Sequence, residues 1–177
     1  MCFTPQTITE GCSDASGGLE QIGVIPQADV TIFGAINSDK KIPSVTFATG
    51  KKMFEIEFID EAMSPDGAGG DENDIGTINQ PVKEFVLTLD VKGNVATQRD
   101  YFNQLRKGRL IIAMKMNNGQ IFLAGSPDKP AYCRKVTAKF GKKLENPNIQ
   151  TLEFYFKSKD GIQEYAGTWA SLFTAGA

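Results

Sequence analysis

Residues 84–91 read Glu-Phe-Val-Leu-Thr-Leu-Asp-Val, and this stretch decides the fold class of the chain. Its apolar residues recur at every second position, namely Phe85, Leu87, Leu89 and Val91. Successive side chains of a strand point to opposite faces of its sheet, so this alternation predicts a strand with one buried face. The sequence Lys92-Gly93-Asn94 that follows is typical of a turn.

Further strands are predicted on both sides of this stretch. Residues 52–60 place Phe54, Ile56 and Phe58 on one expected face, and residues 151–157 alternate in the same way. The sequence Asn117-Asn118-Gly119 predicts a hairpin turn. The remaining predictions are two short strands within 19–33, the hairpin strands 110–116 and 120–124, a strand over 132–140, and a last strand with a packed end within 162–177.

One segment carries the signals of a helix. Thr97 is the expected N-cap, the helix is expected over Gln98–Lys107, and Gly108 is the expected stop. Phe102 and Leu105 supply its apolar stripe. Many short strands with a single helix predict a mainly β fold, an antiparallel β-sandwich or squashed barrel with one flanking α-helix.

The chain of 177 residues is the size of one domain. Residues 1–18 are rich in Thr, Ser and Gly and predict a flexible N-terminal arm, so that 19–177 form a single β-rich domain. Residues 63–81 predict a long acidic loop between two strands. No apolar run reaches the roughly 18 residues of a membrane helix, and the start has no signal-peptide pattern, which predicts a protein made in the cytoplasm.

The residue types argue against catalysis. The chain has no histidine, so Ser-His, Cys-His and His-zinc chemistry is excluded. A Ser-x-x-Lys pattern at Ser126 and Lys129 is followed by Pro130, which ends any helix that this chemistry needs. Cys2, Cys12 and Cys133 have no metal-site spacing and are expected as unbonded thiols, with a Cys2–Cys12 bridge as the alternative in an oxidising setting. The sequence therefore predicts a protein that is not an enzyme and has no cofactor and no metal site.

Charge is unevenly distributed along the chain. The predicted loop is acidic, and the region from 134 to 143 is basic without an acidic residue inside it. An acidic and a basic surface on one subunit can meet head-to-tail between neighbouring copies. The candidate subunit contacts are Asp66, Asp71, Glu72, Asp74, Arg134, Lys135, Lys139, Lys142 and Lys143.

A resemblance to a known group of proteins points in the same direction. The runs that carry it are residues 97–105, 108–111, 117–125, Pro130-Ala131, 135–141 and 151–156. In their order and layout they resemble small tail proteins of tailed bacteriophages and prophages. The resemblance implies a tail-tube-like fold whose subunits form rings, commonly hexameric, that stack into a conduit for DNA.

The same resemblance implies the partners and the location. The partners would be further copies of the chain and other phage tail proteins, with DNA touched only non-specifically as it passes and no membrane bound. The location would be the virion, after synthesis in the host bacterial cytoplasm. Two alternatives stay open: another assembly component, such as a tail terminator, neck or capsid-decorating protein, or a carbohydrate- or protein-binding β-sandwich module that uses Trp169 and tyrosines.

Overall fold

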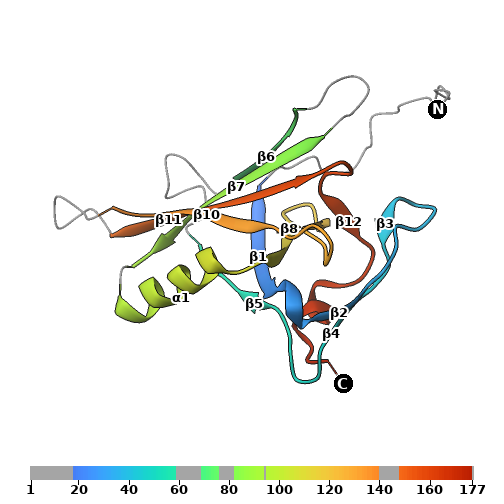
Figure 1. Cartoon of the computed structure of the whole chain (residues 1–177), viewed down its shortest axis with the longest axis horizontal. Helices are drawn as coiled ribbons and strands as arrows, with labels where there is room; N and C mark the ends of the chain where they lie inside the picture. The colour runs from blue at the N-terminus through green and yellow to red at the C-terminus, as the bar shows by residue number, and fades with distance from the viewer. Residues whose placement is uncertain (1–17, 59–68, 76–81, 94, 140–147, 177) are drawn as a thin grey trace.

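The computed structural model describes residues 18–58, 69–75, 82–93, 95–139 and 148–176. This part of the chain is mainly β with one α-helix, which confirms the predicted fold class (Figure 1). In chain order the elements are β1 (Leu19–Pro26), the 3-10 helix η1 (Gln27–Asp29), β2 (Val30–Phe33), β3 (Lys41–Ile42), β4 (Val45–Phe47), β5 (Phe54–Glu55), β6 (Gly69–Asp74), β7 (Lys83–Lys92), α1 (Ala96–Lys107), β8 (Leu110–Met116), β9 (Ile121–Ala124), β10 (Tyr132–Lys139), β11 (Ile149–Ser158), β12 (Gln163–Tyr165) and the 3-10 helix η2 (Trp169–Phe173).

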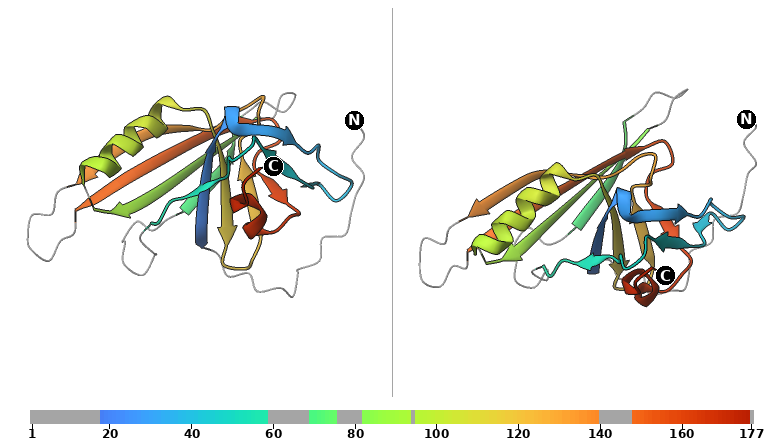
Figure 2. Two further views of the ribbon diagram at one scale, coloured as in Figure 1. Left: turned by 90° about the horizontal axis from the view of Figure 1, so that it is seen from below. Right: turned by 60° about the horizontal axis from the view of Figure 1, so that its bottom comes forward.

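The strands form two main sheets. One has four strands in the order β10-β11-β7-β6, and the other has six in the order β3-β12-β9-β8-β1-β5. A small third sheet pairs β2 with β4. Figures 1 and 2 show the strands of the four-stranded sheet crossing β1 and β8 of the six-stranded sheet at a wide angle. Two sheets packed face to face in this crossed manner form a sandwich of the orthogonal kind.

The main core lies between these two sheets. The alternating residues of β7 and β11 supply one side of it, with Leu87 and Phe154 almost fully buried. Ile22, Ile112 and Met114 of β1 and β8 supply the other side. A second core lies on the opposite face of the six-stranded sheet, where Leu172 of η2 packs beside residues of β2, β4 and β9.

Strand β8 is buried on both faces because it lies between the two cores. Leu110, Ile112 and Met114 belong to the first core, whereas Ile111 and Ala113 belong to the second. A strand buried on both faces is expected to be continuously apolar rather than alternating. This explains the run Leu-Ile-Ile-Ala-Met in the sequence.

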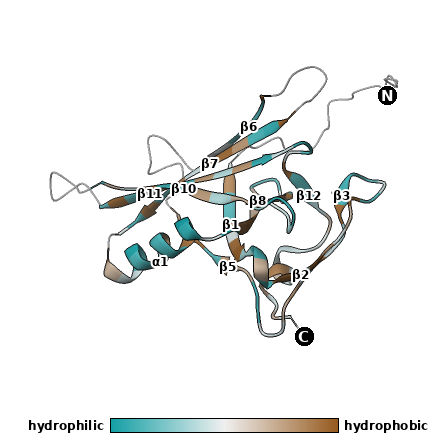
Figure 3. Cartoon of the chain, viewed as in Figure 1, coloured by the Kyte–Doolittle hydropathy of each residue, from teal (hydrophilic) through white to brown (hydrophobic). Residues whose placement is uncertain are grey.

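Helix α1 flanks the four-stranded sheet beside β10 (Figures 1 and 2). Phe102 and Leu105 are buried as predicted, and Figure 3 shows most of the helix in the hydrophilic colour. The helix begins at Ala96, which corrects the predicted start at Gln98 and the predicted N-cap at Thr97. Val95 is the N-cap instead, and its backbone N–H donates to Gln98 Oε1 at 3.4 Å, so a side chain inside the first turn satisfies this donor.

The prediction of a long alternating strand over 52–60 was wrong. Within the described residues only Phe54–Glu55 is strand there, and Phe54 is 51% exposed. Met53 and Ile56 are the buried residues, and they belong to the second and the first core respectively. The segment therefore crosses the edge of the six-stranded sheet beside β1 and sends its apolar residues to opposite sides, which strand periodicity does not describe.

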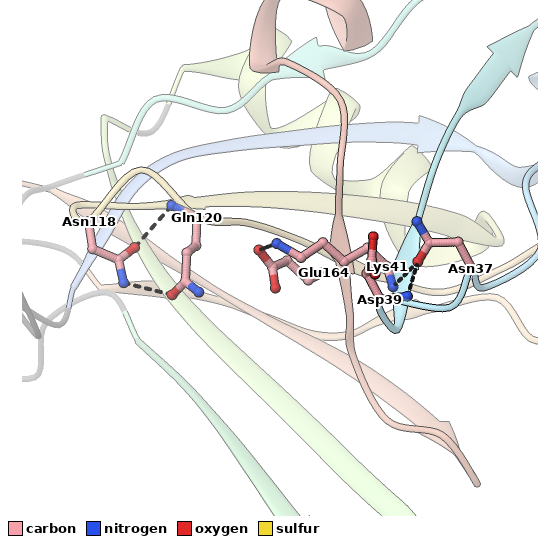
Figure 4. A network of polar contacts seen from close by, with 6 residues as sticks. All are labelled: Asn37, Asp39, Lys41, Asn118, Gln120 and Glu164. Carbon is pink, nitrogen blue, oxygen red and sulfur yellow. Dashed lines mark hydrogen bonds and ion pairs between the residues drawn. The ribbon is translucent and has the colours of Figure 1, made fainter. Parts of the chain in front are cut away.

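Polar contacts fasten the opposite edge of the six-stranded sheet at β3. Lys41 Nζ contacts Glu164 Oε1 at 2.6 Å, and Asn37 Oδ1 accepts hydrogen bonds from the backbone N–H groups of Asp39 and Lys41 (Figure 4). Strand β3 pairs with β12 in parallel, a departure from the predicted all-antiparallel arrangement. Nearby in the same figure, Asn118 and Gln120 bond to each other across the β8–β9 turn, and Gly119 adopts the positive φ of 84° that such a turn requires.

Two predictions lie outside the described residues or only partly within them. The N-terminal arm 1–18 is outside except for Gly18, and so are residues 63–68 and 76–81 of the predicted loop. Among the described helices, none is long and apolar enough to cross a membrane.

Candidate assembly surface

The four-stranded sheet has two outer strands, β6 on one side and β10 on the other. Strand β6 carries Asp71, Glu72 and Asp74, whereas β10 carries three basic residues, Arg134, Lys135 and Lys139. All neighbouring strands of this sheet run antiparallel, so β6 and β10 also run in opposite directions. One chain therefore presents an acidic edge, defined by β6, and a basic edge, defined by β10, at opposite sides of one sheet.

The acidic edge corrects the prediction that residues 63–81 form one long loop. Residues Gly69–Asp74 pair with β7 over the whole strand, from Gly69 opposite Thr88 to Asp74 opposite Lys83. These residues read Gly-Gly-Asp-Glu-Asn-Asp and have no apolar alternation, so no local pattern predicts this strand. Gly70 lies directly against the ring of Phe85, since a Cβ on this residue would lie 2.5 Å from the ring carbon Cζ.

Glu72 is engaged within its own chain. One carboxylate oxygen contacts Lys83 Nζ at 2.9 Å, and the other accepts a hydrogen bond of 2.7 Å from the backbone N–H of Ile162. The hydrogen bond and the charge of Glu72 raise the pKa of Lys83. Glu72 is therefore part of the fold rather than an open contact residue. In the described part of the chain Asp71 and Asp74 make no ion pair, and both are exposed.

The basic edge contains a bulge. The pairing of β10 with β11 shifts register between Cys133 and Lys135, so that Arg134 is the extra residue. Its guanidinium contacts the carboxylate of Glu153 and lies 5.2 Å from the centre of the Tyr155 ring. Like Glu72, Arg134 is therefore bound to residues of its own chain. Lys135 and Lys139 are exposed and form no ion pair with any described residue.

Cys133 lies beneath the basic edge and adds no charge to it. The thiol is 4% exposed, and burial raises its pKa to about 11, an effect that the charge of Arg106 only partly opposes. At neutral pH it is therefore a neutral, buried side chain of the main core.

The structure thus separates the predicted contact residues into three groups. Four are exposed on the two edges without an ion pair to a described residue, namely Asp71, Asp74, Lys135 and Lys139. Glu72 and Arg134 lie on the edges but are bound within the chain. Asp66, Lys142 and Lys143 lie outside the described residues. The partners Lys83 and Glu153 could not be predicted from the sequence, because those pairs depend on strand register.

A groove of about 560 Å³ lies between α1, β1 and β5, and none of its lining residues belongs to β6 or β10. Its lining is mainly apolar and includes the exposed ring of Phe54, the partly buried ring of Tyr101 and the buried Leu105. Burial raises the pKa of Tyr101. Arg109 also lines the groove, and it makes no ion pair with a described residue.

Comparison of the chain with protein-family models, with curated proteins and with solved structures found no match.

Proposed function

We propose that this chain is a self-assembling structural protein of a phage virion, a tail-tube subunit that forms stacked rings around a conduit for DNA. The observation that carries the proposal is the placement of opposite charges on the two outer strands of one sheet. The resemblance of the layout of residues 84–157 to phage tail proteins supports the biological setting. The partners are further copies of the chain and other tail proteins, and DNA is contacted non-specifically.

The two edges suit head-to-tail contact. Strand β6 of one copy lies beside β10 of the next, and these strands meet antiparallel because they run in opposite directions within each sheet. The acidic edge of one copy then contacts the basic edge of its neighbour. Such a heterologous contact closes into a ring when the rotation between copies permits it.

The sheet register indicates how the charges would match. Within one sheet, the paired residues of the four strands form rows that run from β6 to β10. Gly69 of β6 shares a row with Lys135 of β10, and Asp71 shares a row with Tyr132. A neighbour that continues the sheet without offset would therefore put Lys135 beside Gly69. An offset of about two residues brings Lys135 beside Asp71 and keeps every side chain on its own face. Strands of a closed barrel must be staggered, so this offset also favours ring closure.

The edge charges select the partner more than they stabilise the assembly. Exposed ion pairs contribute about 0–1 kcal/mol each. The larger contribution comes from pairing the backbone groups of two outer strands, at about 0.5–1.5 kcal/mol for each hydrogen bond, and from the apolar area that pairing buries. Like charges brought face to face would nevertheless oppose association, so reversing one charge is an effective test.

The test is a charge swap between the edges. Asp71→Lys and Lys135→Glu should each abolish rings in negative-stain images and lower the mass measured by light scattering. The double variant Asp71→Lys/Lys135→Glu should assemble again, because the pair is restored with opposite sign. Asp128→Lys and Lys129→Glu are matched controls, since both residues are exposed on the β9–β10 connection. Assembly by the single edge variants at the wild-type level would refute the proposed interface.

A further inference from the structure

The acidic edge is a strand that its own sequence supports poorly. Strand β6 reads Gly-Gly-Asp-Glu-Asn-Asp, and Gly, Asp and Asn are all disfavoured in strands. Residues 70–74 are exposed, and the strand pairs on one side only, with β7. Backbone pairing alone gives an outer strand of this composition little protection against fraying.

Glu72 provides the additional attachment. Its carboxylate reaches Lys83 of β7 at 2.9 Å and the backbone N–H of Ile162 at 2.7 Å. Ile162 directly precedes β12, which belongs to the six-stranded sheet. A single side chain therefore ties the outer strand both to its neighbour in the four-stranded sheet and to the chain that enters the other sheet.

Gly161 lies against the Glu72 carboxylate and leaves room for it. Gly161 has φ +69°, a conformation that residues with a Cβ rarely adopt. A Cβ at this position would lie 2.7 Å from Lys83 Cδ and would collide with the carboxylate of Glu72. Glycine is therefore required here for two reasons, the backbone conformation and the close approach of the Glu72–Lys83 pair.

We propose that Glu72, Lys83 and Gly161 form a latch that holds β6 in the sheet and thereby presents the acidic edge. Glu72 is a positioning residue: it does not touch the neighbouring copy, but it keeps Asp71 and Asp74 on an ordered strand. When the latch is broken, β6 leaves β7 while both cores stay folded, and the acidic edge is withdrawn. The effect on association rests on the proposed assembly function, whereas the effect on β6 does not.

The test is hydrogen exchange followed by mass spectrometry, carried out on unassembled, dilute protein. Glu72→Ala and Gly161→Ala break the latch from its two sides, and each should make the amides of Gly69–Ile75 exchange about tenfold faster or more. Peptides from β8 and β11 serve as internal evidence that each variant is folded, and their exchange should not change. Asp71→Asn is the matched control on the same strand, and its β6 exchange should stay at the wild-type rate.

A milder variant separates the two contacts of the carboxylate. Glu72→Gln keeps an acceptor for the Ile162 N–H but loses the charge that pairs with Lys83, so its β6 exchange should lie between wild type and Glu72→Ala. The segment around Gly161 and Ile162 should exchange faster in Glu72→Ala than in Glu72→Gln. A purely general destabilisation would not produce this order, because it would raise exchange in β8 and β11 as well.

Association of Glu72→Ala and Gly161→Ala is then measured by light scattering at high concentration. Faster β6 exchange together with lost association supports the latch and its role in assembly. Unchanged β6 exchange in both Glu72→Ala and Gly161→Ala overturns the latch, whatever the association shows. Faster β6 exchange with wild-type association leaves the latch standing and refutes the proposed sheet-edge interface, so the two failures are distinguishable.

Discussion

Replacing Thr151 by Val should destabilise the four-stranded sheet from within. Thr151 lies on β11 opposite Asp90 of β7, and its hydroxyl donates a hydrogen bond of 2.6 Å to Asp90 Oδ1. Asp90 is only 6% exposed, so water cannot easily replace the lost donor. A hydrogen bond to a charged group contributes about 1.5–3 kcal/mol. We therefore expect Thr151→Val to lower the free energy of unfolding by about 2 kcal/mol.

Thr137 provides the matched control. It lies on β10 directly across from Thr151 and is half-buried, and no described residue accepts a hydrogen bond from its hydroxyl. Thr137→Val makes the same chemical change on the neighbouring strand, with the same shift in strand propensity. We expect its free energy of unfolding to stay within about 0.5 kcal/mol of wild type.

Urea unfolding followed by the fluorescence of Trp169, the only tryptophan, gives both values. With an m-value of about 2 kcal/mol/M, the midpoint of Thr151→Val should fall by about 1 M urea, and that of Thr137→Val should hardly move. The protein must be dilute, because association would stabilise the folded state. Equal midpoints for the two variants would show that the Thr151–Asp90 bond does not stabilise this sheet.

Two further predictions concern single residues. Because burial raises the pKa of Cys133 to about 11, only about one thiol in a thousand is ionised at pH 8. Iodoacetamide should therefore label Cys133 on the order of a hundredfold more slowly in folded than in urea-unfolded protein, as measured by site-resolved mass spectrometry. Similar labelling rates in the two states would contradict the burial of Cys133. Gly125→Ala should destabilise the fold more than Gly119→Ala by about 1–3 kcal/mol in urea unfolding. Both glycines have positive φ, but a Cβ on Gly125 would lie 2.8 Å from the carbonyl oxygen of Leu110, whereas Gly119 faces open space. Equal losses of the free energy of unfolding in the two variants would mean that the positive φ alone, and not the close contact at Gly125, causes the destabilisation.

The elements that alternate clearly could be predicted from the sequence. Strands β7 and β11 were predicted because one face of each is buried, and Leu87 and Phe154 lie in the main core as expected. Strand β6 has no apolar alternation in its sequence Gly-Gly-Asp-Glu-Asn-Asp, and pairing with β7 is what makes it a strand. Residues 52–58 misled the prediction because Met53 and Ile56 enter different cores.

The candidate surface was predictable in its charges but not in its geometry. The acidic block and the basic stretch are visible in the sequence, and Lys135 and Asp71 are exposed as expected of contact residues. That they lie on opposite edges of one sheet follows from strand order, which no local pattern encodes. For the same reason Glu72 and Arg134 could not be recognised as internally paired, since Lys83 and Glu153 reach them only through the register of the folded sheet.

If the acidic edge of one copy meets the basic edge of the next, mixing two oppositely altered chains should restore an assembly that neither forms alone. The Asp71→Lys chain and the Lys135→Glu chain each place like charges at every contact with themselves, but opposite charges at every contact with one another. Light scattering of each variant alone and of their equimolar mixture is the measurement. We expect each variant alone to stay unassembled and the mixture to assemble into particles in which the two chains alternate. A mixture that stays as small as its components, or single variants that assemble like wild type, would contradict it.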